Sequence, residues 1–532
     1  MSWLKDFILL GVLLGLLFFI TLGSRPLASP DEARYSEIPR EMLVSGDFIT
    51  PHLNGIKYFE KPPFLYWVQS ASLHSLGNNE WGARTPNAIF AIFTCFITYA
   101  LGRFLYQRQT GIFAAIILGS SLLFFSMAHV VTLDMTLTFA LTACLSSLLA
   151  ALEMRKNKFF FYASYIFAAL AILTKGLVGL LFPMGILFFW ILFLNRWRTL
   201  KTLCLPTGLI LMFALILPWH IAVQLKNPEF FHFYIIEQQF LRFFTLYAGR
   251  YQPAWFFIPI IFVGLFPWTI FLIQTLIRSA IDVIKDKQAH AKELFLLLWP
   301  SFIFIFFSLS KSKLIPYILP TLPPLAILIS HYFEKARTQG VALGLIAFTT
   351  LTLLGTFWAL KENVIPANLS PQLIILVVVI VIGSLLNAFM LFYKIRFSFV
   401  VLCLWAIAID LTVAVSSLSI ESTSVKPLIE QIKQRAKPED IIVSYAHYYQ
   451  DMPFYLQRNI TLVNWTNELD FGMKHQNTDG LTMSEDILWQ RWNEEKTIYI
   501  IMDERQYEKL SKEHTLYLIM KFGNDVLVTN RK

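Results

Sequence analysis

Charged and hydroxyl-bearing side chains crowd the segment that follows the first apolar run. Residues 29–42 read Ser-Pro-Asp-Glu-Ala-Arg-Tyr-Ser-Glu-Ile-Pro-Arg-Glu-Met, shortly after an apolar run over residues 7–23. In a helix, Asp31, Arg34 and Tyr35 share one face, because residues three and four apart are neighbours there. A carboxylate, a guanidinium and a phenol on one face can bind a phosphorylated ligand or orient a nucleophile. This pattern predicts an active site at a membrane surface.

The same residues also fit an ordinary capped helix at the surface. Ser29 and Glu32 have the spacing of a capping box, and Pro30 suits the first helical position. The helix dipole favours Asp31 and Glu32 in the first turn. A cap explains the two acids but not the guanidinium of Arg34, so both interpretations stay open.

Two further clusters combine charge with the ends of apolar runs. Asp134 opens the apolar run 132–152, where an acid is either a helix cap or a functional group at the membrane boundary. Lys311, Lys313 and Tyr317 open another run. Lysines bind phosphate as point charges, and the alternative is that they extend to lipid headgroups. Both clusters are therefore candidates for substrate contacts.

Two loops are long enough to carry structure of their own. Residues 24–85 are too many for a simple connection, and they lead into the amphipathic piece Phe64–Leu76. The second loop, residues 225–253, contains a stretch that fits an interfacial amphipathic helix carrying Arg242. We expect juxtamembrane helices in both loops.

The composition is that of a polytopic membrane protein. The 532 residues are 56% hydrophobic and 15% charged, whereas soluble domains carry about 25% charged residues. The net charge of +9 is attributed to lysine and arginine near the cytoplasmic face and anionic headgroups rather than to nucleic-acid binding. All four cysteines lie in apolar runs without a CxxC pair, so neither a disulfide framework nor a cysteine metal site is expected.

About thirteen segments approach the roughly 20 apolar residues that a spanning helix needs. The first is interpreted as a retained helix rather than a signal peptide, because no small-residue cleavage site precedes the charged loop. The predicted spans are 7–23, 86–106, 111–128, 132–152, 158–174, 176–194, 202–224, 254–278, 293–309, 314–331, 340–361, 371–393 and 398–418.

Lysine and arginine in short loops predict the orientation. With the N-terminus in the cytoplasm, every inside loop is basic and the C-terminus lies outside. Several outer basic residues break this bias, either because an anionic ligand binds on that face or because they pair with nearby acids and headgroups. They are Arg34, Arg40, Lys57, Lys61, Lys175, Arg242, Arg250, Lys311 and Lys313.

The composition changes after the last predicted span. Residues 421–532 mix polar and apolar side chains, with strand patterns at 441–445, 460–463 and 497–501 and helix patterns at 427–435 and 504–512. No GxGxxG, P-loop or HExxH motif occurs there. We therefore predict a transmembrane catalytic domain over residues 1–420 and a small soluble α/β domain over residues 421–532, whose own function the sequence does not indicate.

The first-loop motifs closely resemble those of the aminoarabinose transferases that modify lipid A. This family belongs to the membrane glycosyltransferases that use polyprenyl-phosphate sugars, as protein O-mannosyltransferases do. The resemblance covers roughly residues 1–420, with an α/β tail as in the family. The matching motifs are Asp31-Glu32-Ala33-Arg34-Tyr35, Glu41-Met42, Ser45-Gly46-Asp47, Leu53-Asn54-Gly55, Tyr58-Phe59-Glu60-Lys61-Pro62-Pro63, Tyr66-Trp67, Thr174-Lys175-Gly176 and Lys313 to Pro320.

The resemblance implies a GT-C-type fold with juxtamembrane helices over a lipid-accessible cavity. It makes Asp31 the key acid, and it implies zinc near Glu60 with a histidine from the later interfacial helix. Gln239 stands where that histidine is expected, so a divalent metal stays open and no cofactor is required. The other cavity residues that the resemblance implies are Arg34, Tyr35, Tyr58, Lys61, Asp134 and Tyr317.

The implied reaction moves a sugar, 4-amino-4-deoxy-L-arabinose, from undecaprenyl phosphate to lipid A on the periplasmic face of the bacterial inner membrane. The predicted catalytic acids are Asp31, Glu32 and Asp134. The predicted substrate- and phosphate-binding residues are Arg34, Tyr35, Tyr58, Lys61, Arg242, Lys311, Lys313 and Tyr317.

The expected role of Asp31 in the reaction depends on whether the acceptor is a phosphate or a hydroxyl. A phosphate with a second pKa of about 6 is already an anion at neutral pH and needs no strong base, so Asp31 would hold the sugar amine or the developing positive charge. A protein or glycan hydroxyl would need Asp31 as a general base. Another sugar is an alternative, and a lipid transporter or flippase is a more remote one. Charged groups buried mid-span would favour transport, but here they cluster at the outer ends.

Overall fold

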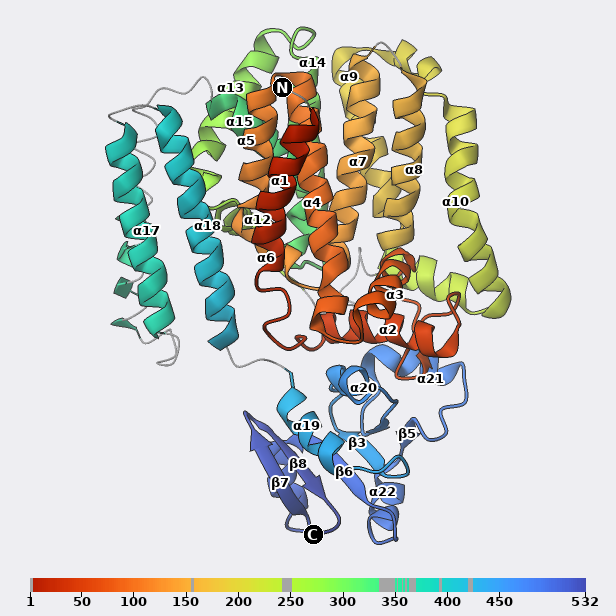
Figure 1. Ribbon diagram of the computed structural model, residues 1–532. Helices are drawn as coiled ribbons and strands as arrows, with labels where there is room; N and C mark the ends of the chain where they lie inside the picture. The colour runs from red at the N-terminus through yellow and green to blue at the C-terminus, as the bar shows by residue number, and fades with distance from the viewer. Residues whose placement is uncertain are drawn as a thin grey trace. The chain divides into compact units, whose positions relative to one another are not determined.

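The computed structural model describes residues 3–154, 157–241, 251–333, 350–351, 353–355, 357–358, 361–362, 370–391, 395–419 and 424–532. It is mostly helical, with one mixed sheet near the C-terminus (Figure 1). The chain divides into two compact units. The helical unit comprises residues 1–21, 87–221 and 235–420, and the mixed unit comprises residues 22–86, 222–234 and 421–532. The domain boundary near residue 420 stays a prediction.

Long apolar helices build the helical unit. Predicted spans begin and end within a few residues of several of them, because uninterrupted apolar runs are a strong local signal. The helices are α1 (Trp3–Phe19), α4 (Glu80–Leu105, which starts in the mixed unit), α5 (Arg108–Gly119), α6 (Leu122–Ala128), α7 (Leu133–Glu153), α8 (Lys158–Lys175), α9 (Val178–Leu194), η1 (Trp197–Thr202), α10 (Leu205–Lys226, which ends in the mixed unit), η2 (His232–Leu241, which starts in the mixed unit), η3 (Ala254–Phe256), α12 (Phe257–Gly264), η4 (Trp268–Phe271), α13 (Leu272–Lys285), α14 (Ala291–Leu309), η5 (Ile315–Thr321), α15 (Leu322–Phe333), α17 (Ser370–Leu391) and α18 (Ile395–Ser419).

Among the described residues, six helices are long and apolar enough to cross a membrane, or up to eight if two bent pairs each count as one span. The bends are 66° between α5 and α6 and 112° between the helices at 254–264 and 268–285. Two predicted spans, 111–128 and 254–278, are therefore broken rather than straight. Most of the predicted span 340–361 falls outside the described residues, so the count of thirteen stays a prediction.

Both breaks have local causes. Ser120 and Ser121 donate their hydroxyls to the carbonyls of Ile116 and Ile117, which offers the backbone an alternative to the helical ladder. Pro267 has no backbone N–H and interrupts the helical hydrogen bonds at the second break.

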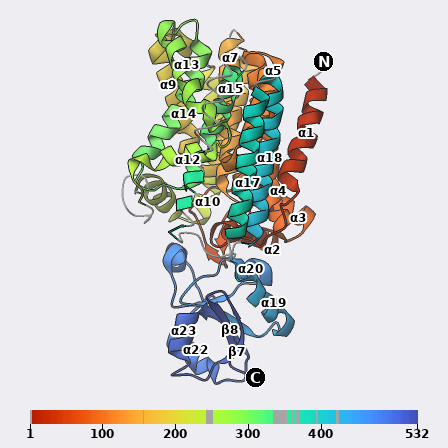
Figure 2. The same cartoon turned by 90° about the vertical axis from the view of Figure 1, so that its left-hand side faces the viewer.

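Other helices pack against each other along their length. Figure 2 shows α17 and α18 side by side, and the Trp405 indole of α18 donates to the Val379 carbonyl of α17 at 3.0 Å.

The mixed unit contains a six-stranded sheet in the order β5-β4-β3-β6-β8-β7. Strands β5, β4, β3 and β6 run parallel, and β8 and β7 are antiparallel additions at one edge. All three predicted strands and both predicted helices are confirmed. The elements are α19 (Lys426–Arg435), β3 (Ile441–Tyr445), α20 (Asp451–Leu456), β4 (Thr461–Val463), η7 (Asn467–Leu469), α21 (Asp470–Lys474), β5 (Thr482–Met483), α22 (Glu485–Trp492), β6 (Ile498–Asp503), α23 (Glu504–Leu510), β7 (Tyr517–Phe522) and β8 (Asp525–Thr529).

The first loop supplies the other half of the mixed unit. It forms α2 (Asp31–Ser45), a hairpin of β1 (His52–Leu53) with β2 (Ile56–Lys57), and α3 (Phe64–Leu76). Asn54 and Gly55 turn the hairpin with φ of 55° and 73°, the positive values that an Asn-Gly turn provides. Asn54 also exchanges two hydrogen bonds of 2.9 Å with the backbone of Ile460, so the hairpin is bound to the start of β4.

Candidate active site

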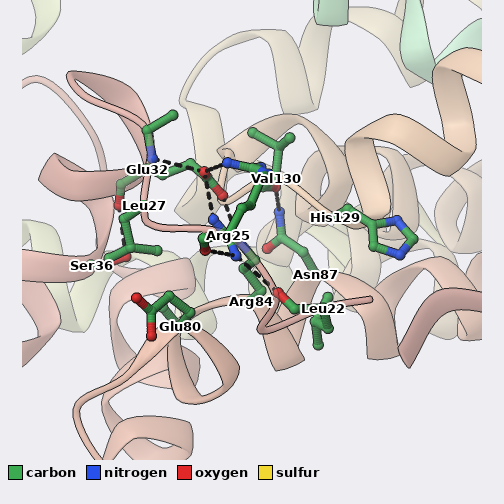
Figure 3. A network of polar contacts seen from close by, with 12 residues as sticks. Leu22, Arg25, Leu27, Glu32, Ser36, Glu80, Arg84, Asn87, His129 and Val130 are labelled. Atoms are coloured by element: carbon green, nitrogen blue, oxygen red, sulfur yellow. Dashed lines mark hydrogen bonds and ion pairs between the residues drawn. The ribbon is translucent and has the colours of Figure 1, made fainter. Parts of the chain in front are cut away.

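Glu32 lies in a buried ion-pair network of the mixed unit (Figure 3). Arg84 donates Nε to Oε1 at 2.8 Å and Nη2 to Oε2 at 2.9 Å, and its remaining N–H groups bind carbonyls within residues 22–26. Arg25 pairs with Oε2 at 2.5 Å, and the Ala28 N–H donates to it at 3.0 Å. Burial alone would raise the pKa of Glu32, but Arg84 and Arg25 outweigh it and hold the pKa at about 2.

This network corrects two predictions about the start of α2. Glu32 was predicted to be catalytic, but its side chain is 1% exposed and both oxygens are bound, so it clamps the loop rather than contacting substrate. The capping box is wrong at Ser29, since Pro30 is the N-cap without a side-chain cap and the Ser29 hydroxyl donates to Gln450. Glu32 does accept a backbone N–H at the helix start, as a capping box requires, from Ala28.

Arg34 is the centre of a second buried group in the mixed unit. Its Nη1 donates to the Tyr58 hydroxyl at 3.0 Å and pairs with Glu468 Oε2 at 2.8 Å. Its Nη2 lies 3.4 Å from Asp31 Oδ1, which confirms the predicted contact across one helix face. The guanidinium also lies 5.7 Å from the ring centroid of Tyr35. Arg34 is thus surrounded by two carboxylates and two phenols.

The remaining first-loop candidates lie close to this group. The Lys61 ammonium donates to the Glu60 carbonyl at 2.9 Å and its residue is buried. The rings of Tyr35 and Tyr66 are 6.3 Å apart. Burial raises the pKa of Tyr58 well above its usual value, Arg34 opposes this, and Glu60 adds to it.

A third carboxyl group of α2 is buried without a full ion pair. Arg40 binds both oxygens of Glu37 at 2.6 and 2.5 Å. Glu41 accepts only the Gly55 N–H at 2.9 Å through Oε2, and its Oε1 has no partner within the described chain. Burial and the neighbouring Glu37 raise the pKa of Glu41 well above its ordinary value. Glu41 is therefore a weaker acid than an exposed glutamate, and its hydrogen bond from Gly55 fastens α2 to the β1–β2 hairpin.

The helical unit holds its own cluster. Asp134, in the first turn of α7, pairs with Lys175 at the end of α8, with Oδ1 and Nζ 2.5 Å apart. The Lys175 ammonium lies 4.1 Å from the ring centroid of Tyr317 in η5. Thr132 is the N-cap of α7, so Asp134 is not the cap residue. This arrangement joins an acid, a cation and a phenol from three elements of the helical unit.

The two lysines near η5, Lys311 and Lys313, differ in burial and in their contacts. Lys313 is buried, and its ammonium donates to the carbonyls of Ser310 and Gln252 at 2.5 and 2.8 Å. Burial and the nearby Lys311 lower the pKa of Lys313. Lys311 is exposed and lies 5.9 Å from the ring centroid of Tyr251. Lys311 is thus the more accessible cation of the two, and Arg242 lies outside the described residues.

The donor set around Glu60 does not fit zinc. Within the described residues, no group of three His, Cys, Asp or Glu side chains is placed to hold a metal ion. Gln239 occupies the position where the resemblance calls for a histidine. An amide oxygen is a poor zinc ligand compared with imidazole. We therefore derive no step through a metal.

The fold places the chain among membrane glycosyltransferases. It is similar to ArnT from Cupriavidus metallidurans bound to undecaprenyl phosphate, with a TM-score of 0.87, 25% identity and coverage of 100% of this chain and 99% of that chain. The Archaeoglobus fulgidus oligosaccharyltransferase tethered with an acceptor peptide shares the fold at a TM-score of 0.52 and 12% identity, over 99% of this chain and 74% of that chain. These similarities confirm the predicted GT-C-type fold.

Similar sequences show to which family of membrane glycosyltransferases the chain belongs. Residues 60–221 match the family described as dolichyl-phosphate-mannose-protein mannosyltransferase, and residues 428–530 match the aminoarabinose transferase C-terminal domain. The undecaprenyl phosphate-alpha-4-amino-4-deoxy-L-arabinose arabinosyl transferase 1 of Proteus mirabilis is 30% identical over 81% of this chain and 77% of its own length. A relative so named in Erwinia tasmaniensis is 30% identical over 68% of each chain. The chain belongs to this arabinosyl transferase family, which confirms the resemblance.

The sequence did not predict two residues as ion-pair partners of candidate site residues. Lys175 was noted as an outer basic residue and as part of the Thr174-Lys175-Gly176 motif, but its ion pair with Asp134 joins positions 41 residues apart. Glu468 carried no signal at all, since an isolated acid in the C-terminal domain resembles any solvated side chain.

Proposed function

We propose that the protein transfers 4-amino-4-deoxy-L-arabinose from undecaprenyl phosphate to a phosphate of lipid A. The observation that carries this is the fold match over the whole chain to a relative bound to undecaprenyl phosphate. The names of the sequence relatives supply the sugar. The enzyme is a glycosyltransferase with a polyprenyl-phosphate sugar as donor and a glycolipid as acceptor.

The chemistry needs positioning and charge screening more than proton transfer. A lipid A phosphate oxygen attacks the anomeric carbon, the bond from that carbon to the donor phosphate breaks, and its electron pair leaves with undecaprenyl phosphate. Two phosphates must approach each other, so cations that bind them lower the barrier. In the helical unit, Lys175 and Lys311 suit this work, and Tyr317 is a hydrogen-bond donor.

Asp31 has a role that fits its environment. Its side chain is 43% exposed and touches Arg34 only at 3.4 Å, so it remains available to a substrate. Next to the anomeric carbon, a carboxylate stabilises the positive charge that develops as the bond to the donor phosphate stretches. Asp31 is therefore proposed as the electrostatic stabiliser of the transition state.

The location follows from the apolar helices and the family. A multi-pass protein of the bacterial inner membrane is the expected setting. Basic inside loops support an N-terminus in the cytoplasm, with the first loop and the C-terminal domain in the periplasm. Accessibility of single introduced cysteines to a membrane-impermeant reagent tests this orientation.

A transfer assay tests the function. Purified protein in lipid is incubated with the aminoarabinose donor and lipid A, and products are identified by mass spectrometry. We expect lipid A heavier by one aminoarabinose and an equal amount of undecaprenyl phosphate. Wild-type protein that leaves lipid A unmodified under conditions where a relative modifies it would refute the proposal.

A hydroxyl acceptor is the second candidate, because residues 60–221 match a family described by protein mannosylation. A hydroxyl must lose its proton during attack, which would make Asp31 a general base. The pH dependence separates the two: a general base gives a rate that rises through its pKa, whereas transfer to a phosphate dianion follows the acceptor pKa of about 6.

A further inference from the structure

The β1–β2 hairpin is too short to be stable by itself. Each of its strands has two residues, and isolated two-stranded hairpins are marginal at best in water. The Tyr58 N–H binds the Pro51 carbonyl across the hairpin, so the Lys57 N–H faces the opposite edge of β2. An unpaired strand edge needs partners for its N–H and C=O groups. In this protein the partner comes from the C-terminal domain.

The side-chain amide of Gln476 occupies this edge as a third strand would. Its Oε1 accepts the Lys57 N–H at 2.9 Å, and its Nε2 donates to the Gly55 carbonyl at 2.9 Å. The backbones approach closely beside it, because a Cβ at Gly472 would lie 2.2 Å from the Lys57 carbonyl oxygen. A primary amide both accepts and donates, whereas an ionised carboxylate only accepts and an ammonium only donates. Gln476 therefore fixes the backbone of β2.

The segment that directly follows β2 carries a predicted substrate-binding residue. Tyr58 comes next after Lys57, and its hydroxyl accepts Arg34 Nη1 at 3.0 Å. The following residue, Phe59, packs edge-to-face on Phe471 of α21, with ring centroids 6.2 Å apart. The C-terminal domain thus binds the chain on both sides of Tyr58.

The tip of the hairpin has an attachment of its own. Asn54 exchanges two hydrogen bonds of 2.9 Å with the backbone of Ile460. Gln476 instead binds Lys57, the residue directly before Tyr58. Loss of the Gln476 amide should therefore shift the backbone next to Tyr58 while the tip stays bound.

We propose that Gln476 is a positioning residue for the transfer reaction: it fixes the backbone at Lys57 and thereby the place of the Tyr58 side chain beside Arg34. This inference rests on the proposed function and on the predicted contact of Tyr58 with the donor. Gln476 acts through Tyr58 and does not itself touch the substrate.

A double-mutant cycle on the full-length protein in lipid tests this. Gln476→Met has a side chain of similar size that forms neither hydrogen bond. We expect it to lower kcat/KM for the aminoarabinose donor about tenfold, the effect of one to two net hydrogen bonds. In a Tyr58→Phe background the same change should cost little further, because the hydroxyl that Gln476 places is already gone.

Gln476→Glu adds a pH profile to the test. An ionised carboxylate accepts the Lys57 N–H but cannot donate to the Gly55 carbonyl, whereas the protonated acid does both. We expect this variant to be impaired at pH 8 and to approach the wild-type rate as the pH falls towards about 4.3, the ordinary pKa of glutamate. Gln476→Met should show the same fractional loss at both pH values.

Asn477→Ala is the matched control, since Asn477 is the next residue and its amide binds Asp479 on an exposed surface. It should keep the wild-type rate. Rates are compared per folded molecule, after size-exclusion chromatography has removed unfolded protein. Full activity of Gln476→Met would overturn the inference, and so would equal losses in the wild-type and Tyr58→Phe backgrounds.

Binding of undecaprenyl phosphate separates this inference from the proposed function. A wild-type protein that binds undecaprenyl phosphate but never modifies lipid A would refute the proposed function. In that case, weaker binding by Gln476→Met that disappears in the Tyr58→Phe background would still support the positioning role. Binding that Gln476→Met leaves unchanged would overturn the positioning role as well.

Discussion

At the scale of single residues, two buried acids of α2 have pKa values that are shifted in opposite directions. Glu32 is buried among arginines, which hold its pKa at about 2, whereas burial beside Glu37 raises the pKa of Glu41. The two lie nine positions apart on one helix. Partners, rather than burial, decide whether such a carboxyl group is charged.

Removing Arg84 should unfold the first loop. Arg84→Ala leaves the carboxylate of Glu32 buried without its main partner, and breaking a buried pair in this way costs about 3–5 kcal/mol. Thermal unfolding in detergent, followed by exposure of cysteines introduced in the loop, measures the loss. Arg435→Ala, on an exposed helix end, is the control and should change little.

Two carboxyl groups of α2 should change the stability of the protein with pH in opposite directions. The folded pKa of Glu32 lies below its ordinary value of 4.5, so its stabilisation is complete above about pH 4.5 and is lost as the pH falls towards 2. The folded pKa of Glu41 lies above 4.5, so its contribution is complete below pH 4.5 and falls as the pH rises. We expect Glu41→Gln, which keeps the Gly55 hydrogen bond, to stabilise the protein at pH 8 relative to wild type but not at pH 4. Unfolding midpoints at the two pH values measure this, and equal shifts at both would contradict it.

At the scale of elements, helix ends and turns bring the functional groups together. Lys175 ends α8 next to Gly176, and Asp134 lies in the first turn of α7, so two helix termini meet at one ion pair. We expect Lys175→Met and Asp134→Asn each to lower transfer by more than tenfold, with the double variant no worse than the poorer single one, because coupled partners are not additive. Kinetics of the three variants test this; additive losses would show that the residues act independently.

The β1–β2 hairpin needs its Asn-Gly turn. An added Cβ at Gly55 would lie 2.6 Å from the Asn459 side chain, and φ at Gly55 is +73°. Gly55→Ala should therefore destabilise the mixed unit by about 1–3 kcal/mol. The unfolding midpoint measures the effect, and Gly46→Ala, also at positive φ but with open space around it, separates backbone strain from crowding.

Sequence reasoning succeeded where the signal is local. The apolar and β-branched strand pattern at 441–445, the Asn54-Gly55 turn and the helix-face contact of Asp31 with Arg34 all depend on neighbouring residues. It failed where the partner is remote. The ion pair of Arg34 with Glu468 and the arginine clamp on Glu32 depend on which segments the fold brings together, and spacing along the chain says nothing about that.

At the scale of the molecule, the first loop and the C-terminal domain share one compact unit. Every acid predicted to be catalytic lies within residues 1–420, so a chain that ends there would retain them all. We nevertheless expect such a truncated protein to insert in the membrane and to be inactive, because Asn54, Arg34 and Lys57 lose partners in the C-terminal domain. Membrane fractionation with the transfer assay tests this, and activity close to wild type would contradict it.

The hydrogen bonds between Asn54 and Ile460 have a consequence for biosynthesis. A ribosome adds about 5–20 residues per second, so synthesis of the roughly 400 intervening residues takes on the order of half a minute. During that time the hairpin, Arg34 and Glu41 have left the translocation machinery while the segments that cover them do not yet exist. We therefore expect substitutions that weaken the hairpin to reduce the yield of protein before they reduce the activity of each molecule.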